Sequence, residues 1–443
     1  MRGPESATSM AKLSAGWNAR AVEERVGASD VKGIAVALAG FLLAAAVPAV
    51  ALLISGQIRL ATVVIAFGAI LLLVSRRPRS HVAFAAALFM FAHTEIAHTS
   101  SAVEGASRAA ALLVLGMGCL QAGFGQTTRT VGALVATMVG GGLAYGSVVV
   151  VHGVAPAVLL AVATFIVVNV ALFQAASRIP STEIQRGLEW VMSLALASCL
   201  LAGVAVPSVG LEANRLEGIF VNANTCGFFA ALGLVLAVVG KGRKLNHFLV
   251  AVAVFSLLWS ASRSALLALA VSLLVCAVRL LFTRERDKRV FRAVVVGALL
   301  SVAVLMFVNT ADFLILRSND SRLGGTEYAL AVASKNPWSG VGYQGSVVEI
   351  ASSPLRWLAE AGIPGLSAVL LAYVLILLLA WRSTPAVLLV TTFGVVSSLF
   401  EGWFFAGGSA LFFTFWLVYL VAFGHAKDPL FGGVANPAED ARI

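Results

Sequence analysis

The chain has 443 residues, of which 60% are hydrophobic and only 12% are charged, and its mean hydropathy is +0.94. Soluble domains carry about a quarter charged residues, so this composition excludes a soluble enzyme and predicts a polytopic membrane protein. A net charge of +10 can indicate nucleic-acid binding, but the distribution of the charges along the chain favours another explanation. The four cysteines lie in apolar runs at unrelated spacings, which predicts neither a disulfide framework nor a zinc site.

Apolar segments long enough, or nearly long enough, to cross a bilayer recur along the chain. The predicted spans are 33–55, 59–75, 81–98, 107–125, 130–152, 154–177, 187–207, 218–240, 246–260, 264–282, 291–308, 358–380, 385–405 and 409–424. Because several are short, we expect roughly 12–14 transmembrane helices. The predicted fold class is therefore an all-α, polytopic helical bundle, and no alternating strand pattern is seen.

Five parts follow from these spans. They are an N-terminal cytoplasmic tail (1–32), a transmembrane bundle (33–308), a large extracytoplasmic loop (309–357), C-terminal transmembrane helices (358–424) and a cytoplasmic tail (425–443). The first tail is open to two interpretations, an amphipathic helix on the inner leaflet or a partly disordered segment.

The lysines and arginines divide unevenly between the two sides of the membrane. If the N-terminus is cytoplasmic and the spans alternate, most of them fall in inner segments, and both termini lie inside. This is the bias expected of a membrane protein oriented by its basic residues. The positive charge is therefore a topology signal, and we expect membrane lipids, not nucleic acid, around the chain.

The loop at 309–357 contains signals for the start and the end of a helix, which predicts an ordered segment. Thr326 is a predicted N-cap and Pro337 a terminator for a short helix between them. A glycine-rich turn around Tyr343 follows. A long ordered loop in a compact protein is usually functional.

Three arginines of the outer side stand near span ends or the start of the predicted helix. Arg322 precedes that helix, Arg215 precedes Asn222 and Asn224 near a span start, and Arg263 lies in a tight turn between two spans. A guanidinium keeps its charge and matches phosphate oxygens, so these arginines predict a site for a lipid-linked phosphate or pyrophosphate. The alternative is that each one reaches the lipid headgroups on its own.

These residues also carry a resemblance. The segments that carry it, in order, are 215–224, 262–264, 322–325, 336–342 and 358–365. Together they resemble the O-antigen ligase and O-antigen polymerase family of bacterial membrane glycosyltransferases, over roughly residues 215 to 420.

The resemblance implies a GT-C-like bundle in the bacterial cytoplasmic membrane that needs no cofactor and no metal. It implies transfer of a glycan from undecaprenyl pyrophosphate to a hydroxyl of a sugar or glycolipid acceptor. Arg263 and Arg322 would hold the pyrophosphate, Arg215 would assist them, and Asn222, Asn224 and Tyr343 would bind substrate.

The sequence departs from this family at one position. Relatives usually carry a histidine about ten residues before the Gly-Ile-Pro-Gly element, taken as the group that handles the acceptor hydroxyl, and 349–354 here contains none. Glu360 is one catalytic candidate; because the family also carries an acid at this position, a structural role is the alternative. The other candidates for the acceptor base are Glu349, Asp320, Glu327 and a cluster of His93, Glu95 and His98, although a structural role is favoured for the cluster. Glu401 is a further acid inside an apolar span, and its alternative role is a hydrogen bond to a neighbouring span.

Two other functions stay open at this point. A catalytically inactive relative that binds lipid-linked glycan would explain the missing histidine. A transporter of polyprenyl-linked glycan or another anion would explain the many spans, although no repeated halves are seen.

Overall fold

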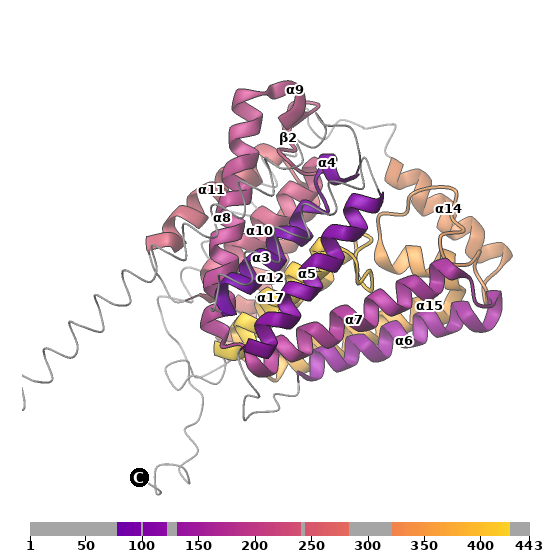
Figure 1. The fold of residues 1–443 in the computed structure, drawn as a ribbon. Helices are drawn as coiled ribbons and strands as arrows, with labels where there is room; N and C mark the ends of the chain where they lie inside the picture. Colours follow the sequence, from indigo (N-terminus) through magenta and orange to yellow (C-terminus); the bar gives the residue numbers. More distant parts are fainter. Residues whose placement is uncertain (1–77, 99–100, 122–130, 241–243, 283–320, 426–443) are drawn as a thin grey trace, which may run out of the picture.

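The computed structural model describes residues 78–98, 101–121, 131–240, 244–282 and 321–425 (Figure 1). The described elements are α3 (Pro78–Phe91), α4 (Glu95–His98), α5 (Ser101–Gln121), α6 (Gly132–His152), α7 (Pro156–Arg178), α8 (Ser181–Ala205), α9 (Pro207–Gly210), β1 (Leu211–Glu212), β2 (Arg215–Leu216), α10 (Ala223–Val239), α11 (Lys244–Ser260), α12 (Arg263–Phe282), α14 (Ser321–Lys335), α15 (Ser353–Trp381), α16 (Pro385–Ser398) and α17 (Ala410–His425). Helices α6, α7 and α15 run side by side along one edge of the bundle, and α14 lies beside one end of α15.

Within these described segments, five helices are long and apolar enough to cross a membrane: α6, α7, α8, α12 and α15. Helices α3, α10, α11, α16 and α17 are apolar but shorter. The predicted all-α, polytopic membrane fold is confirmed. The predicted spans at 33–55, 59–75 and 291–308 lie outside the described residues.

The bundle separates two kinds of apolar side chain. Aromatic residues of α17, such as Phe412 and Trp416, are fully buried at its centre. Val150 of α6, Leu160 of α7 and Leu201 of α8 are exposed instead. Hydrophobic residues all round a helix are expected where one face packs on protein and the other meets lipid.

The predicted span 81–98 is wrong as one continuous helix, because the chain breaks between α3 and α4. Thr94 Oγ1 donates to the Phe91 carbonyl at 2.7 Å and accepts from the Ala97 N–H at 3.3 Å. Thr94 also forms an isolated β-bridge with Phe220, and the Val221 N–H donates to the His93 carbonyl at 3.2 Å. Pairing with a distant segment replaces the helical hydrogen bonds here, a competition that hydropathy does not register.

The predicted span 385–405 also ends early, at Ser398 of α16. The segment that follows is held to the start of α15 by Ser353, whose Oγ donates to the Glu401 carbonyl at 2.8 Å and accepts from the Phe404 N–H at 3.0 Å. Phe405 has a positive φ of 68°, which a helix does not allow. Residues 399–405 are therefore a loop, buried at Trp403, Phe404 and Phe405, and not a helix.

The short helix predicted in the large loop is present as α14, but it begins at Ser321 and not after Thr326. The predicted N-cap at Thr326 is therefore wrong, because Gly324 and Gly325 are part of the helix. Gly325 packs closely, since a Cβ there would stand 2.6 Å from the Glu349 carbonyl oxygen. The predicted stop before Pro337 is confirmed, because α14 ends at Lys335.

A two-stranded antiparallel hairpin, too short to leave an alternating pattern, joins α9 to α10. Leu211 pairs with Leu216 and Glu212 with Arg215. The turn residues Ala213 and Asn214 both have positive φ, 49° and 66°, as a tight two-residue hairpin turn requires. This hairpin fixes the position of Arg215.

Candidate functional site

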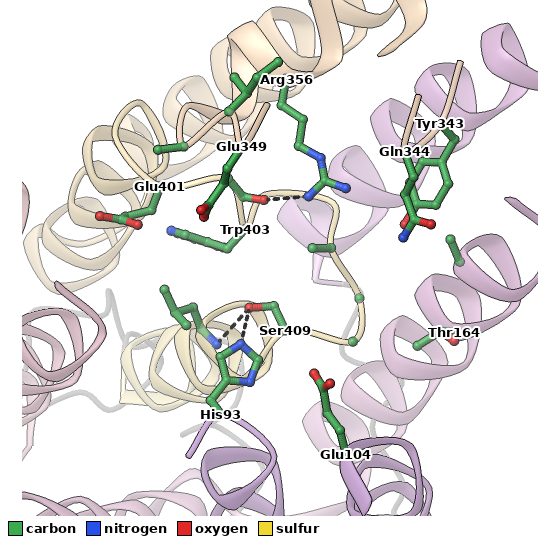
Figure 2. Close-up of a pocket in the computed structure, with 18 of the residues that line it drawn as sticks. His93, Glu104, Thr164, Tyr343, Gln344, Glu349, Arg356, Glu401, Trp403 and Ser409 are labelled. Atoms are coloured by element: carbon green, nitrogen blue, oxygen red, sulfur yellow. Dashed lines mark hydrogen bonds between the residues drawn. The ribbon is translucent and has the colours of Figure 1, made fainter. Parts of the chain in front are cut away.

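A cavity of about 770 Å³ opens where many helices begin or end together (Figure 2). Its lining comes from the α3–α4 turn, from α5, α6, α7 and the start of α10, and from segments 343–360 and 401–411. In the predicted topology, the non-helical segments that line the cavity all lie at the extracytoplasmic side of the membrane. One end of the bundle thus gathers polar residues from both halves of the chain.

One wall of the cavity is built by a break in α15. Gly362 has φ 67° and ψ −158°, inside what is otherwise one long helix, and Pro364 follows. The break leaves backbone carbonyls without helical partners: the Val341 N–H donates to Ala359 at 2.8 Å and the Gly342 N–H to Glu360 at 3.0 Å. A Cβ at position 362 would stand 2.5 Å from the Pro337 carbonyl oxygen, so glycine permits this seating. The loop thereby brings Tyr343 next to α15.

An ion pair lies on this wall. Arg356 Nε donates to Glu360 Oε1 at 3.0 Å, and Arg356 Nη1 donates to the Gly402 carbonyl at 3.3 Å. The guanidinium carbon lies 5.9 Å from the centre of the Tyr343 ring. Glu360 is 2% exposed, and within the described residues its Oε2 has no hydrogen-bond partner. A buried carboxylate with one oxygen fixed and the other without a partner, on a residue that lines the cavity, is a candidate for contact with a substrate hydroxyl.

The opposite wall carries a second cation. Arg108 of α5 forms an ion pair with Glu104, one turn earlier. His93 lies beside the start of α17, with Nε2 3.5 Å from Ser409 Oγ. Burial, followed by the nearby charges of Arg108 and His98, lowers the pKa of His93 to about 3, so its imidazole is neutral at physiological pH. Figure 2 shows His93 and Ser409 together, across the cavity from Arg356.

Aromatic rings line the space between the walls. The Tyr145 and Tyr343 ring centres are 5.8 Å apart, and Tyr145 meets Trp357 edge-on at 4.9 Å. Tyr145 Oη donates to the Phe405 carbonyl at 3.0 Å. Burial raises the pKa of Tyr343, which keeps its hydroxyl protonated. Rings beside charged groups provide the mixed surface on which a sugar, apolar on one face and polar at its edges, can bind.

Asn222, Tyr343 and Glu360, three residues predicted from the sequence, line the cavity. Asn222 also caps α10, since its Oδ1 accepts from the Thr225 N–H at 2.8 Å. Asn224 faces Arg215 instead, accepting from Nη2 at 3.0 Å.

The three arginines predicted to bind pyrophosphate are not all found at the cavity. Arg215 Nε donates to the Ser260 carbonyl at 2.9 Å, which ties the hairpin to the turn between α11 and α12. Arg263 begins α12 and is exposed. Arg215 and Arg263 thus flank one turn, but neither lines the cavity. The side chain of Arg322 lies outside the described residues, so convergence of all three stays a prediction.

The other candidates for the acceptor base differ in whether they line the cavity. Glu349, Glu401, His93 and His98 line the cavity, and Ser264, next to Arg263, donates to Glu401 Oε1 at 3.3 Å. Glu327 is exposed on α14, and Asp320 lies outside the described residues.

Sequence reasoning did not select Arg108, Arg356 or Ser409. Each of the two arginines stands four residues from a glutamate near the start of a helix, as Glu104–Arg108 and Arg356–Glu360. A charged pair one turn apart in an apolar helix was the available signal, because isolated charges at membrane depth are costly.

The comparisons with known proteins bear on the wall that holds Tyr343, Arg356 and Glu360. Residues 248–370 match the family model described as O-antigen ligase. This stretch is an O-antigen ligase domain. It covers well under half of the chain and includes α12, α14 and the first part of α15. No curated protein matches the chain.

The family resemblance drawn from the sequence is thereby confirmed. The O-antigen ligase domain supports a role of this membrane protein in cell-surface polysaccharide assembly and an activity of the glycosyltransferase type. The wall with His93, Arg108 and Ser409 lies outside the matched residues.

Proposed function

We propose that the protein transfers a glycan from undecaprenyl pyrophosphate to a sugar hydroxyl at the outer face of the bacterial cytoplasmic membrane. The observation that carries the proposal is the polar cavity at one end of an apolar bundle, walled on one side by the O-antigen ligase domain. A lipid-linked donor needs such a junction, because its tail stays among apolar helices while its charged head enters a polar site.

In the proposed reaction, the acceptor hydroxyl oxygen attacks the anomeric carbon of the donor sugar. The bond from that carbon to the pyrophosphate oxygen breaks, and undecaprenyl pyrophosphate leaves with the electron pair. Since the leaving group is already activated, the protein has to neutralise the charge that develops on it and orient the acceptor. The fixed charges of Arg263 and Arg322, assisted by Arg215, are proposed for the first task. Arg215 and Arg263 do not line the cavity, but the turn that holds them meets it where Ser264 donates to Glu401.

The acceptor proton needs a base, and we propose Glu360. Its Oε2 has no partner within the described residues, its Oε1 is fixed by Arg356, and both residues line the cavity. Arg356 is then a positioning residue, because it orients the carboxylate without meeting the reacting atoms. Tyr343, Asn222 and Asn224 are proposed to contact or position the substrates.

The test is transfer by the full-length protein in detergent or nanodiscs. It is incubated with an undecaprenyl-pyrophosphate oligosaccharide and a panel of sugar and glycolipid acceptors, and the products are measured by mass spectrometry. We expect a glycosylated acceptor and free undecaprenyl pyrophosphate. Arg263→Ala and Arg322→Ala should abolish the product, whereas Arg382→Ala, an exposed residue after the far end of α15, should not.

Full turnover by Arg263→Ala or by Arg322→Ala would refute the proposed role of that arginine. Donor binding without any product from any acceptor would favour the alternative of an inactive relative, which the missing histidine at 349–354 supports. Flux of an anionic solute into liposomes without an acceptor would favour transport.

A further inference from the structure

The wall of the cavity outside the O-antigen ligase domain contains buried polar atoms that no residue of the described structure satisfies. Within the described residues, Arg108 Nε and His93 Nδ1 are buried and have no hydrogen-bond partner. Buried polar atoms in folded proteins nearly always have one. Two such atoms on residues of one wall of a polar cavity are consistent with a ligand that supplies the missing partners.

The charges on this wall select the kind of ligand. Arg108 packs close to the backbone just before α17, since a Cβ at Gly408 would stand 3.3 Å from Arg108 Nη1. Ser409 Oγ accepts from the Leu411 N–H at 3.3 Å, so the wall includes the first turn of a 16-residue helix. A guanidinium and a helix N-terminus both favour negative charge, and the neutral imidazole of His93 and the Ser409 hydroxyl can donate hydrogen bonds to it.

We propose that Arg108, His93 and Ser409 bind an anionic group, a phosphate or a carboxylate, carried by the acceptor glycan. The acceptor role rests on the proposed function. The wall faces Arg356 across the cavity (Figure 2), and it is separate from the turn that holds Arg215 and Arg263. A glycan lying between the walls would therefore place its acidic group against α17 and a hydroxyl near Glu360. The protein then selects acidic acceptors.

Glu104 is a second residue whose substitution tests anion binding at this wall. Its carboxylate neutralises Arg108 in the empty cavity through their ion pair. An incoming anion must share Arg108 with Glu104, and removal of that carboxylate should strengthen anion binding. A purely structural ion pair would behave in the opposite way, since loss of Glu104 would loosen the wall and strengthen nothing.

The test is binding of small acidic sugars to the full-length protein in nanodiscs, measured by isothermal titration calorimetry with glucose 1-phosphate, glucuronate and glucose. We expect both acidic sugars to bind at least about tenfold more tightly than glucose. Arg108→Gln should weaken the acidic sugars by about tenfold or more, the size expected for a charge-assisted hydrogen bond, and leave glucose unchanged. Glu104→Gln should strengthen them, and the control Arg382→Gln should change nothing.

Equal affinities for the three sugars, or normal binding by Arg108→Gln, would overturn the proposal. If Arg108→Gln fails to fold, Arg108→Lys keeps the charge without the planar fork, and intermediate binding is expected. Competition with undecaprenyl pyrophosphate separates the two possible sources of the anion. Binding that persists at saturating donor supports an acceptor site, whereas complete competition would assign this wall to the donor and overturn the proposal.

These measurements do not require turnover. Selective binding of acidic sugars by a protein that transfers nothing would contradict the proposed function and leave the anion site in place. Transfer to neutral acceptors as fast as to acidic ones would contradict the inference and leave the proposed function in place.

Discussion

Arg356 and Glu360 lie one turn apart on α15 and form an ion pair, Nε to Oε1, at 3.0 Å. The carboxylate is almost fully buried, whereas the arginine keeps partial access to the cavity. Because the Gly362 break follows directly, the pair stands where the helix leaves its regular path and contacts the 340–343 loop. The pair thus connects the fold of the O-antigen ligase domain to its cavity.

Removing one partner of this pair should be more damaging than removing both. Arg356→Ala leaves the Glu360 charge buried without compensation, which costs about 3 kcal/mol, and should lower the thermal midpoint by several degrees. The double variant Arg356→Met with Glu360→Leu should recover most of that loss but not transfer activity. Thermal unfolding in detergent and the transfer assay measure the two effects. A double variant with normal turnover would show that Glu360 is not the base.

Close packing at Gly227 of α10 should control the turn that carries Arg263. A Cβ at this position would stand 2.3 Å from Ser262 Cβ. Gly227→Ala should therefore destabilise the protein by about 1–3 kcal/mol, as overpacking does, and weaken donor binding. The matched control is Gly233→Ala on the same helix, where the nearest atom, Leu249 Cδ1, is 3.4 Å away. Equal melting curves for the two variants would contradict this account.

Glu217, in the segment between β2 and α10, should make stability depend on pH. Burial, followed by the charges of Glu212 and Glu95, raises its pKa to about 7. The folded state thus holds a proton that the unfolded state releases above pH 4.5, so the stabilisation is present below about pH 4.5 and is lost as the pH rises to about 7. Melting curves at pH 5 and pH 8 measure this. Glu217→Gln should reduce the difference, whereas Glu327→Gln, on the exposed face of α14, should leave it unchanged.

Arg215 should matter for its fork geometry as well as its charge. It donates to the Ser260 carbonyl and to Asn224 Oδ1 from two different nitrogens. Lysine keeps the charge but cannot span both acceptors, so Arg215→Lys should lower stability and loosen the turn before Arg263. Asn224→Ala removes one of the two bonds and should show a smaller loss. A lysine variant as stable as the wild type would assign Arg215 a role in binding alone.

The sequence alone determined the class of the protein and much of its helical order. Composition and the recurrence of apolar segments required a membrane bundle, because no soluble fold buries so much apolar sequence. The motifs around Arg263 and Gly362 indicate the family, and the same motifs point to Asn222, Tyr343 and Glu360, which share the cavity.

Tertiary structure alone decided which charges meet. Arg108 and Arg356 are far apart in the sequence, and they face one cavity because α5 and α15 begin at the same end of the bundle. Hydropathy also could not locate the breaks at Thr94 and after Ser398, since backbone groups there bond to distant segments. Apolar periodicity reports which residues avoid water. It does not report which helix ends share a cavity, and here that arrangement forms the candidate site.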